Sequence, residues 1–280
     1  MTDTRFAPHP WNIDFEWQRS PGNGGALTPQ QIEQFDTDGF VVLENLIDSE
    51  TLAQIRDTID EIEQPIEDRP RRTDAPVTIS EKGVINFAPK LVARSPMLRS
   101  FAQDRRLVDV CLDLVGPDVN LYWDQAVYKR AERPRRFPWH QDNGYNFVDP
   151  QQYLTIWLAL SDATEDNGCP HVAPGVHRSG TLKHVFVEPL GYECFNEPDH
   201  SVSAPVKAGG AVVFSSLTPH LTGPNVAGGV RKAYILQYAA SDAAVLEGDA
   251  SAGRPTGRRP CVDPDHQFAV ARGGRPVGAT

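Results

Sequence analysis

The spacing of hydrophobic residues changes near Asn120, and this change limits the folds open to the chain. Before Asn120 apolar residues recur at helical spacing, whereas after it short β-prone runs are separated by Gly, Pro, Asn and Asp. The runs cover residues 121–123, 126–128, 153–160, 184–187, 211–214 and 233–238. Helices followed by many short strands predict an α+β, mainly β chain with an antiparallel core, a sandwich or an open barrel.

The N-terminal half carries the predicted helices. The first begins after Thr28, a suitable N-cap, with Pro29 at its first position, and ends at Asp38-Gly39. A strand at residues 40–43 should follow. Two more helices are predicted, one capped by Asp48 with apolar residues at positions 52, 55, 59 and 62, the other over residues 107–114.

Residues 28–247 should form a single domain, because no repeat or linker interrupts them. Residues 1–27 are predicted to be an arm that either docks on the domain through its aromatic residues or is a mobile tail. Residues 248–280 should be a tail that wraps the body or is poorly ordered. Residues 64–81 carry prolines and mixed charges, which indicates a loop, either a lid or a connector.

Charge and composition exclude several classes of protein. The net charge of -10 disfavours a nucleic-acid partner, whose phosphates are also negative. The four cysteines form no Cys-x-x-Cys pair and are interpreted as reduced thiols. Neither a membrane-spanning run nor the apolar core of a signal peptide is present, so we expect a soluble cytoplasmic protein; the oligomeric state is left open.

The motif His140-Gln141-Asp142 is the first candidate site. Residues two apart on a strand share a face, so His140 and Asp142 can bind one metal ion. Two histidines and a carboxylate form the facial triad of non-haem iron, which leaves coordination positions open. The motif alone fits a structural pair equally well. Of the remaining histidines His220 is the best placed, since it follows the strand at residues 211–214 and opens a turn-rich segment.

Arg231 lies at the start of the last strand of the β region. Its planar guanidinium suits bidentate binding of a carboxylate, although a surface arginine is the alternative. The order His140-x-Asp142, His220, Arg231 resembles the iron(II)/2-oxoglutarate dioxygenases of the phytanoyl-CoA dioxygenase family. Segments 27–43, 157–169 and 174–178 are also similar to that family, and the resemblance runs from about residue 27 to about residue 238.

This resemblance implies a double-stranded β-helix core with the N-terminal helices packed outside. It also implies that iron(II) is bound by His140, Asp142 and His220. Arg231 and Thr222 would bind the distal carboxylate of the cosubstrate 2-oxoglutarate, and Gln125 would also contact this cosubstrate. Trp157 would form a wall of the pocket; the alternative for Trp157 is a buried aromatic residue without a contact role. The resemblance further implies O2 as cosubstrate, and hydroxylation of a small-molecule metabolite with release of succinate and CO2.

Asp142 disfavours halogenation, since related halogenases have a small residue at this position. The candidate substrate pocket consists of Asn143, Tyr145, Asn146, Phe147 and Arg136. Arg133 and Arg135 are weaker candidates, and His171 and His177 are expected to be structural. The acidic chain mildly disfavours an acyl-CoA substrate.

Several alternatives remain open at this point. The same iron centre can desaturate, epimerise or close a ring, because each reaction begins with hydrogen abstraction. A metal-binding β-barrel without turnover and a zinc hydrolase with the same ligands are the other candidates. A carboxylate-binding arginine and threonine disfavour both.

Overall fold

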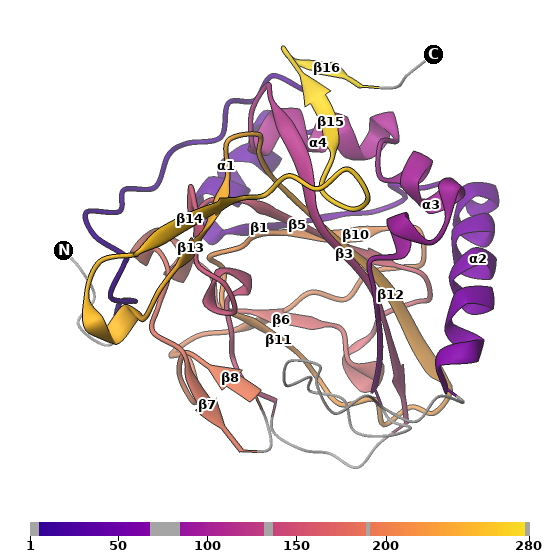
Figure 1. Cartoon of the computed structure of the whole chain (residues 1–280). Helices are drawn as coiled ribbons and strands as arrows, with labels where there is room; N and C mark the ends of the chain where they lie inside the picture. The colour runs from indigo at the N-terminus through magenta and orange to yellow at the C-terminus, as the bar shows by residue number, and fades with distance from the viewer. Residues whose placement is uncertain (1–5, 68–84, 132–136, 189–190, 278–280) are drawn as a thin grey trace.

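The computed structural model describes residues 6–67, 85–131, 137–188 and 191–277. Long strands form its centre, and helices pack beside them (Figure 1). One large antiparallel sheet forms the main wall. Its strand order is β1 (Phe40–Leu43), β10 (Ala211–Ser215), β5 (Leu154–Ala159), β12 (Val230–Ala240), β3 (Val119–Arg130), β15 (Ala269–Arg272) and β16 (Arg275–Pro276), and β2 (Ile85–Pro89) also pairs with β3.

Smaller sheets complete the β structure. They are β11 (His220–Thr222), β6 (Pro170–Val172) and β9 (Val202–Ser203) in one sheet, β14 (Gly257–Pro260), β13 (Ala244–Glu247) and β4 (Val148–Asp149) in another, and the hairpin of β7 (Val185–Val187) and β8 (Gly191–Glu193). The strands β6 and β11 lie opposite the large sheet, so the core has two layers (Figure 1).

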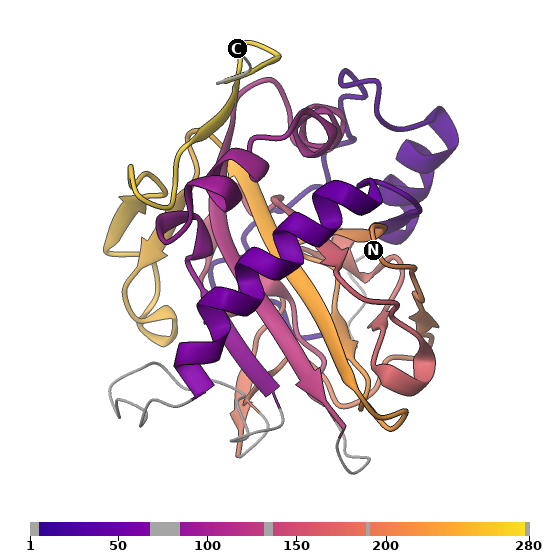
Figure 2. The ribbon, with the colours of Figure 1, turned by 90° about the vertical axis from the view of Figure 1, so that its right-hand side faces the viewer.

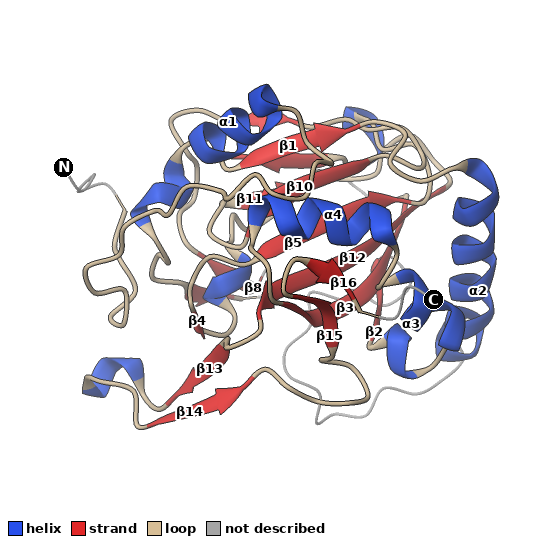
Figure 3. Cartoon of the chain, turned by 90° about the horizontal axis from the view of Figure 1, so that it is seen from above, coloured by secondary structure: helices blue, strands red, loops and turns tan. Residues whose placement is uncertain are grey.

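The helices pack on the outer face of the large sheet. They are α1 (Pro29–Asp38), α2 (Ser49–Glu67), α3 (Pro96–Phe101) and α4 (Arg105–Leu114). The helix α2 crosses the strands of this sheet (Figure 2), and α4 lies over β10 and β5 in the view from above (Figure 3). Ile55 and Ile59 of α2 are fully buried in the same apolar cluster as Leu236 of β12. Burial of each such side chain contributes about 1.5–3 kcal/mol. The mainly β core with helices packed outside is therefore confirmed.

Strand β5 shows how the large sheet separates two interiors. Leu154, Ile156 and Leu158 belong to the apolar cluster beneath the helices, whereas Trp157 belongs to a second cluster between the two sheets. Alternate residues of a strand face opposite sides, so a strand buried on both faces reads as continuously apolar. The second cluster marks the inside of the barrel.

Two sequence-based boundaries were wrong. Residues 121–123 and 126–128 belong to the single strand β3. Asp124, which suggested a break between them, is buried in the strand. It is accommodated there because its carboxylate accepts hydrogen bonds from the backbone N–H groups of Leu91 and Val92 at 2.8 and 3.1 Å. The predicted loop at residues 64–81 begins too early, since α2 continues to Glu67. The hypothesis of a lid was made for residues 64–81, and residues 68–81 of that segment lie outside the described residues.

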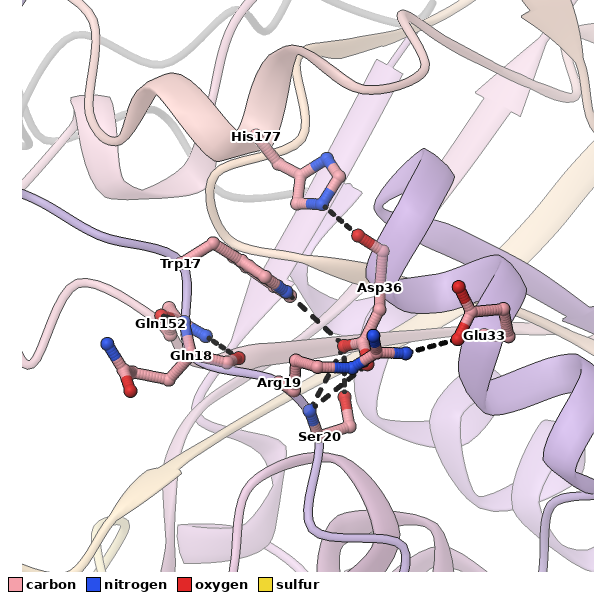
Figure 4. Close-up of polar contacts among 8 residues, drawn as sticks. All are labelled: Trp17, Gln18, Arg19, Ser20, Glu33, Asp36, Gln152 and His177. Atoms are coloured by element: carbon pink, nitrogen blue, oxygen red, sulfur yellow. Dashed lines mark hydrogen bonds and ion pairs between the residues drawn. The ribbon is translucent and has the colours of Figure 1, made fainter.

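The N-terminal arm is fixed to α1 by the carboxylate of Asp36. Trp17 donates its indole N–H to Oδ1 at 3.3 Å, and Ser20 donates its backbone N–H and its hydroxyl to the same oxygen at 3.0 and 2.8 Å (Figure 4). Trp17 also packs edge-on against the ring of His177, with centroids 4.4 Å apart. We call Trp17, Ser20, Asp36 and His177 the arm anchor.

Asp113 of α4 fixes the end of the arm. Each of its oxygens accepts two backbone N–H groups, at 2.6–3.0 Å, from Gly24, Gly25, Ala26 and Leu27. A side chain at position 24 would collide with the backbone of Asp109, so glycine is required there.

The C-terminal segment packs on the body, because β15 pairs with β3 and β14 pairs with β13. Within the described residues, no helix has the length and apolarity needed to cross a membrane.

Candidate metal centre

Three side chains, His140, Asp142 and His220, bring their ligand atoms within 4.8 Å of one another. Nε2 of His220 lies 3.8 Å from Oδ1 of Asp142, and the two imidazole centroids are 4.3 Å apart. Among the described residues this is the only such group of His, Cys, Asp and Glu side chains. The structure thus brings together the three residues predicted as metal ligands.

The two histidines are placed by a backbone bridge between distant parts of the chain. His140 N–H donates to the His220 carbonyl at 3.1 Å, and His220 N–H donates to the His140 carbonyl at 2.9 Å. The sequence predicted that Asp142 lies on one strand with His140. This was wrong, because Asp142 opens the short 3₁₀ helix Asp142–Gly144. The turn of the backbone, rather than strand alternation, directs its carboxylate to the histidines.

Both imidazoles present the same nitrogen to the site. The Nδ1 atoms of His140 and His220 lie 3.2 and 3.0 Å from the carbonyls of Pro138 and Thr218, so each Nδ1 carries the proton and donates it. The Nε2 lone pairs are then free for a metal. Burial, with the nearby His220 as a second cause, lowers the pKa of His140 well below its usual value and favours the neutral ligand form.

Asp142 is oriented by a threonine that the sequence analysis missed. The Thr155 hydroxyl donates to Oδ2 of Asp142 at 2.5 Å, and the side-chain amide of Gln237 lies 3.4 Å from that hydroxyl. Oδ1 is left to face His220. Thr155 lies two residues before Trp157 on the inner face of β5, and this spacing was the available signal.

The donor set fits a divalent iron ion. Metal bonds of about 2.0–2.2 Å at the right angles of a facial triad place two donors about 3 Å apart, so the 3.8 Å between His220 and Asp142 would close by about 1 Å around a bound ion. Neutral imidazoles that donate their other ring N–H to backbone carbonyls, together with one hydrogen-bonded carboxylate, are typical of such sites.

The predicted carboxylate-binding arginine lies inside the barrel. Arg231 is 1 % exposed, so the surface alternative is wrong, and its guanidinium carbon lies 5.0 Å from the ring of Trp157. Lys129, which the sequence analysis missed, is its cross-strand neighbour on β3 and is fully buried. Lys129 donates to the carbonyls of Gly223 and Thr222 at 2.5 and 3.3 Å, and so fixes the end of β11. Two cationic side chains therefore lie side by side in the interior.

The other two residues predicted to bind the cosubstrate lie on strands of the same barrel. Gln125 is paired with Ile235 between β3 and β12, and Thr222 ends β11, two residues after His220. Both are partly exposed. Trp157 is 4 % exposed in the cluster between the sheets, which agrees with either of its two predicted roles.

The predicted substrate residues separate into different environments. Tyr145 lies edge-on to His140 at 5.4 Å and is 39 % exposed, and Asn146 is exposed. Phe147 is buried and contacts the arm residues His9 and Trp11. Asn143 is also buried, donating to the Thr181 hydroxyl at 2.6 Å and accepting from the Val148 N–H at 2.8 Å, so its polar atoms support the loop. Arg136, with Arg133 and Arg135, lies outside the described residues.

The remaining histidines near the site have structural contacts. Nε2 of His177 lies 3.3 Å from the Asp36 carbonyl within the arm anchor. Nε2 of His184 accepts the backbone N–H of Gln141, the residue between two candidate ligands, at 2.9 Å. His184, which the sequence analysis placed only in a strand, therefore supports the loop that carries the candidate ligands.

Comparisons with known proteins agree with this geometry. The family model described as phytanoyl-CoA dioxygenase (PhyH) matches residues 35–233. An ectoine dioxygenase of Sphingopyxis alaskensis is 26 % identical over 76 % of this chain and 75 % of its own length, and a phytanoyl-CoA dioxygenase of Arabidopsis thaliana is 23 % identical over 79 % and 92 %.

Solved structures are similar in fold. The non-haem α-ketoglutarate-dependent carbocyclase SnoK from nogalamycin biosynthesis has a TM-score of 0.68 at 20 % identity, covering 90 % of this chain and 99 % of its own. The apo form of EctD from S. alaskensis has a TM-score of 0.62 at 23 % identity, covering 84 % and 82 %. The expected double-stranded β-helix fold is thereby confirmed.

Proposed function

The chain belongs to the phytanoyl-CoA dioxygenase family, and on this premise we propose that its barrel binds iron(II) and 2-oxoglutarate and hydroxylates a small-molecule metabolite. Members of this family are iron(II)/2-oxoglutarate-dependent oxygenases that use O2, and this chain is such an enzyme. The observation that carries the proposal is the convergence of His140, Asp142 and His220 inside the barrel that also contains Arg231.

In this proposal His140, Asp142 and His220 bind iron through the two Nε2 atoms and Oδ1. Bound iron with 2-oxoglutarate and O2 supplies the oxidising chemistry, with succinate and CO2 as co-products. The protons on both Nδ1 atoms stay with the carbonyls of Pro138 and Thr218. The Thr155 hydroxyl keeps Oδ2 of Asp142 turned away, so that the carboxylate offers one oxygen.

Arg231 would pair with the distal carboxylate of 2-oxoglutarate, with Thr222 and Gln125 as further polar contacts and Trp157 as a wall. Burial strengthens such a pair, because water does not compete for the guanidinium. Lys129 would add positive potential next to Arg231 while it fixes the end of β11. Such buried cations support an anionic cosubstrate and disfavour a barrel that only binds a metal.

Hydroxylation is proposed over the other outcomes of hydrogen abstraction because the curated relatives are named as dioxygenases. The epimerase SnoN and the carbocyclase SnoK are each less than 25 % identical to this chain and are similar to it in fold alone. Desaturation has no specific support among the described residues.

The test is succinate formation from 2-oxoglutarate, measured with and without iron(II) and O2. We expect formation to require both, and Arg231→Ala to raise the 2-oxoglutarate concentration for half-maximal rate at least about tenfold, since a charge-assisted hydrogen bond is worth about 1.5–3 kcal/mol. Arg231→Lys keeps the charge and should raise this 2-oxoglutarate concentration less than Arg231→Ala does. An unchanged 2-oxoglutarate requirement in Arg231→Ala would remove the assigned role, and succinate formation without iron would refute the function.

A further inference from the structure

Three aromatic rings contact one another in sequence on the surface. Tyr145 contacts Tyr192 at 5.6 Å and 75°, and Tyr192 contacts Phe186 at 5.6 Å and 77°. These rings are 39, 39 and 42 % exposed respectively. We call Tyr145, Tyr192 and Phe186 the aromatic row.

The aromatic row is continuous with the candidate metal centre. Tyr145 stands edge-on to His140, with centroids 5.4 Å apart and planes at 88°. Tyr192 and Phe186 face each other across the hairpin of β8 and β7. The residue after β8, Cys194, donates its backbone N–H to the carbonyl of Trp139, next to His140, at 2.8 Å. The row therefore begins beside a proposed iron ligand and leads outward along a hairpin that is tied to the same segment.

Exposed rings at such a position need an explanation. A large apolar side chain is usually buried, and a contiguous exposed group marks a binding surface more often than isolated exposed residues do. Val185, next to Phe186 on β7, is also exposed, whereas Ile13, Val226 and Val262 lie on separate segments of the chain. The side chains of the row also share a chemistry, since all three are aromatic and two carry a phenolic hydroxyl.

We propose, resting on the proposed function, that the aromatic row selects the substrate of the iron centre and that this substrate carries a planar, conjugated system of two or more fused rings. Successive planes turned by 75–88° present both faces and edges, the two arrangements that aromatic partners prefer. A system of two fused rings spans one step of 5.6 Å along the row, and a larger ring system spans both steps. The hydroxyls of Tyr145 and Tyr192 can bond oxygen substituents on its rim.

The test uses two probes with the same carbon skeleton and hydroxyl position, the aromatic 2-naphthol and the saturated decahydro-2-naphthol. Each is titrated calorimetrically into the anaerobic protein loaded with iron(II) and 2-oxoglutarate. We expect 2-naphthol to bind about tenfold more tightly than the saturated probe. Tyr192→Ala should lower the affinity for 2-naphthol about tenfold, whereas Tyr192→Phe should retain most of this affinity. The matched control is Val262→Ala, an exposed apolar residue far along the chain, which should change nothing.

The outcomes separate this inference from the proposed function. The visible charge-transfer band of iron-bound 2-oxoglutarate reports the metal and cosubstrate, and its absence would refute the function itself. If the band forms, the inference is overturned by equal affinities for the two probes, by no detectable binding of 2-naphthol, or by an affinity unchanged in Tyr192→Ala. Light scattering, which reports the oligomeric state, adds a further criterion. If the protein is a dimer that Tyr192→Ala dissociates while the affinity for 2-naphthol is unchanged, the aromatic row binds a second copy of the chain. That result would also overturn the inference.

Discussion

Two carboxylates inside this protein show opposite ways of being held. Asp113 has both oxygens occupied, each accepting two backbone N–H groups of the arm. Asp142 has one oxygen held by Thr155, while the other faces the imidazole of His220 at 3.8 Å. A fully paired carboxylate stabilises the fold, because its desolvation is compensated within the protein. A half-paired carboxylate beside two histidines that turn Nε2 toward it is arranged for a cation that the protein does not itself supply.

The same contrast holds for histidines. In the metal centre, His140 and His220 each use Nδ1 on a carbonyl and keep Nε2 for the site. In the arm anchor, His177 is enclosed by Trp17 and the carbonyl of Asp36. The first arrangement is expected to control activity and the second stability, and four predictions test this separation.

The largest effect is expected from Asp142→Ala. Loss of a metal ligand removes several kcal/mol of transition-state stabilisation, so succinate formation should fall by about a thousandfold or more. The midpoint of thermal unfolding of the metal-free protein should change little, because Asp142 contributes one side-chain hydrogen bond. Near-native turnover in this variant would contradict the role of Asp142 as a metal ligand.

Asp113→Asn should produce the converse. The substitution keeps the shape but points an amide NH2 at two N–H donors, which should lower the free energy of unfolding by about 3 kcal/mol. Iron-dependent turnover of the folded fraction should be retained. The matched control is Asp109→Asn on the same helix, which loses only its ion pair with Arg105 at 3.1 Å and should cost about 0.5 kcal/mol. Equal losses in the two variants, measured by denaturant titration, would contradict the role of Asp113.

Thr155→Val sharpens the comparison by freeing the second oxygen of Asp142. Removal of a side chain that hydrogen-bonds a metal ligand costs about 10–100-fold in metal affinity, and we expect a loss in this range for iron(II), measured by anaerobic equilibrium titration. Thr155→Ser retains the hydroxyl and should restore most of the affinity. An iron affinity that Thr155→Val leaves intact would show that the carboxylate is oriented without the hydroxyl.

The smallest effect concerns His177 and pH. Burial lowers the pKa of His177 to about 4, below the value of about 6.5 expected in the unfolded chain. The folded state therefore binds fewer protons, so the stabilisation is complete above pH 6.5 and is lost as the pH falls toward 4. Between pH 8 and pH 5 this group should account for about 2 kcal/mol of lost stability. His177→Gln should reduce that loss in urea titrations; an identical pH dependence would contradict the assignment.

Local sequence was sufficient for the parts of the molecule that depend on local physics. The first helix starts at the predicted cap, where Thr28 and Gln31 form a capping box, and it ends at Gly39 in the left-handed conformation. The strands near residues 153–160, 211–214 and 233–238 are present as β5, β10 and β12 with slightly different ends. Periodicity and capping are short-range properties, so they can be read from neighbouring residues.

The contacts that orient the site depend on register between distant segments. Thr155 reaches Asp142 from another strand, Lys129 reaches the carbonyl of Gly223, and Asp113 binds the arm 86–89 residues earlier in the chain. No local pattern indicates these pairs. His140 and Asp142 were found because their types and spacing suit a metal, although the backbone that unites them is a turn rather than the expected strand.

The most direct test of the central claim is anaerobic titration of the metal-free protein with iron(II) and 2-oxoglutarate. The visible charge-transfer band of the chelated 2-oxo acid should develop in the native protein and in folded Asp113→Asn, and should be absent in Asp142→Ala. That result would assign iron to the half-paired carboxylate and its two histidines. A band of native intensity in Asp142→Ala, or iron binding to the native protein without a band, would contradict the account.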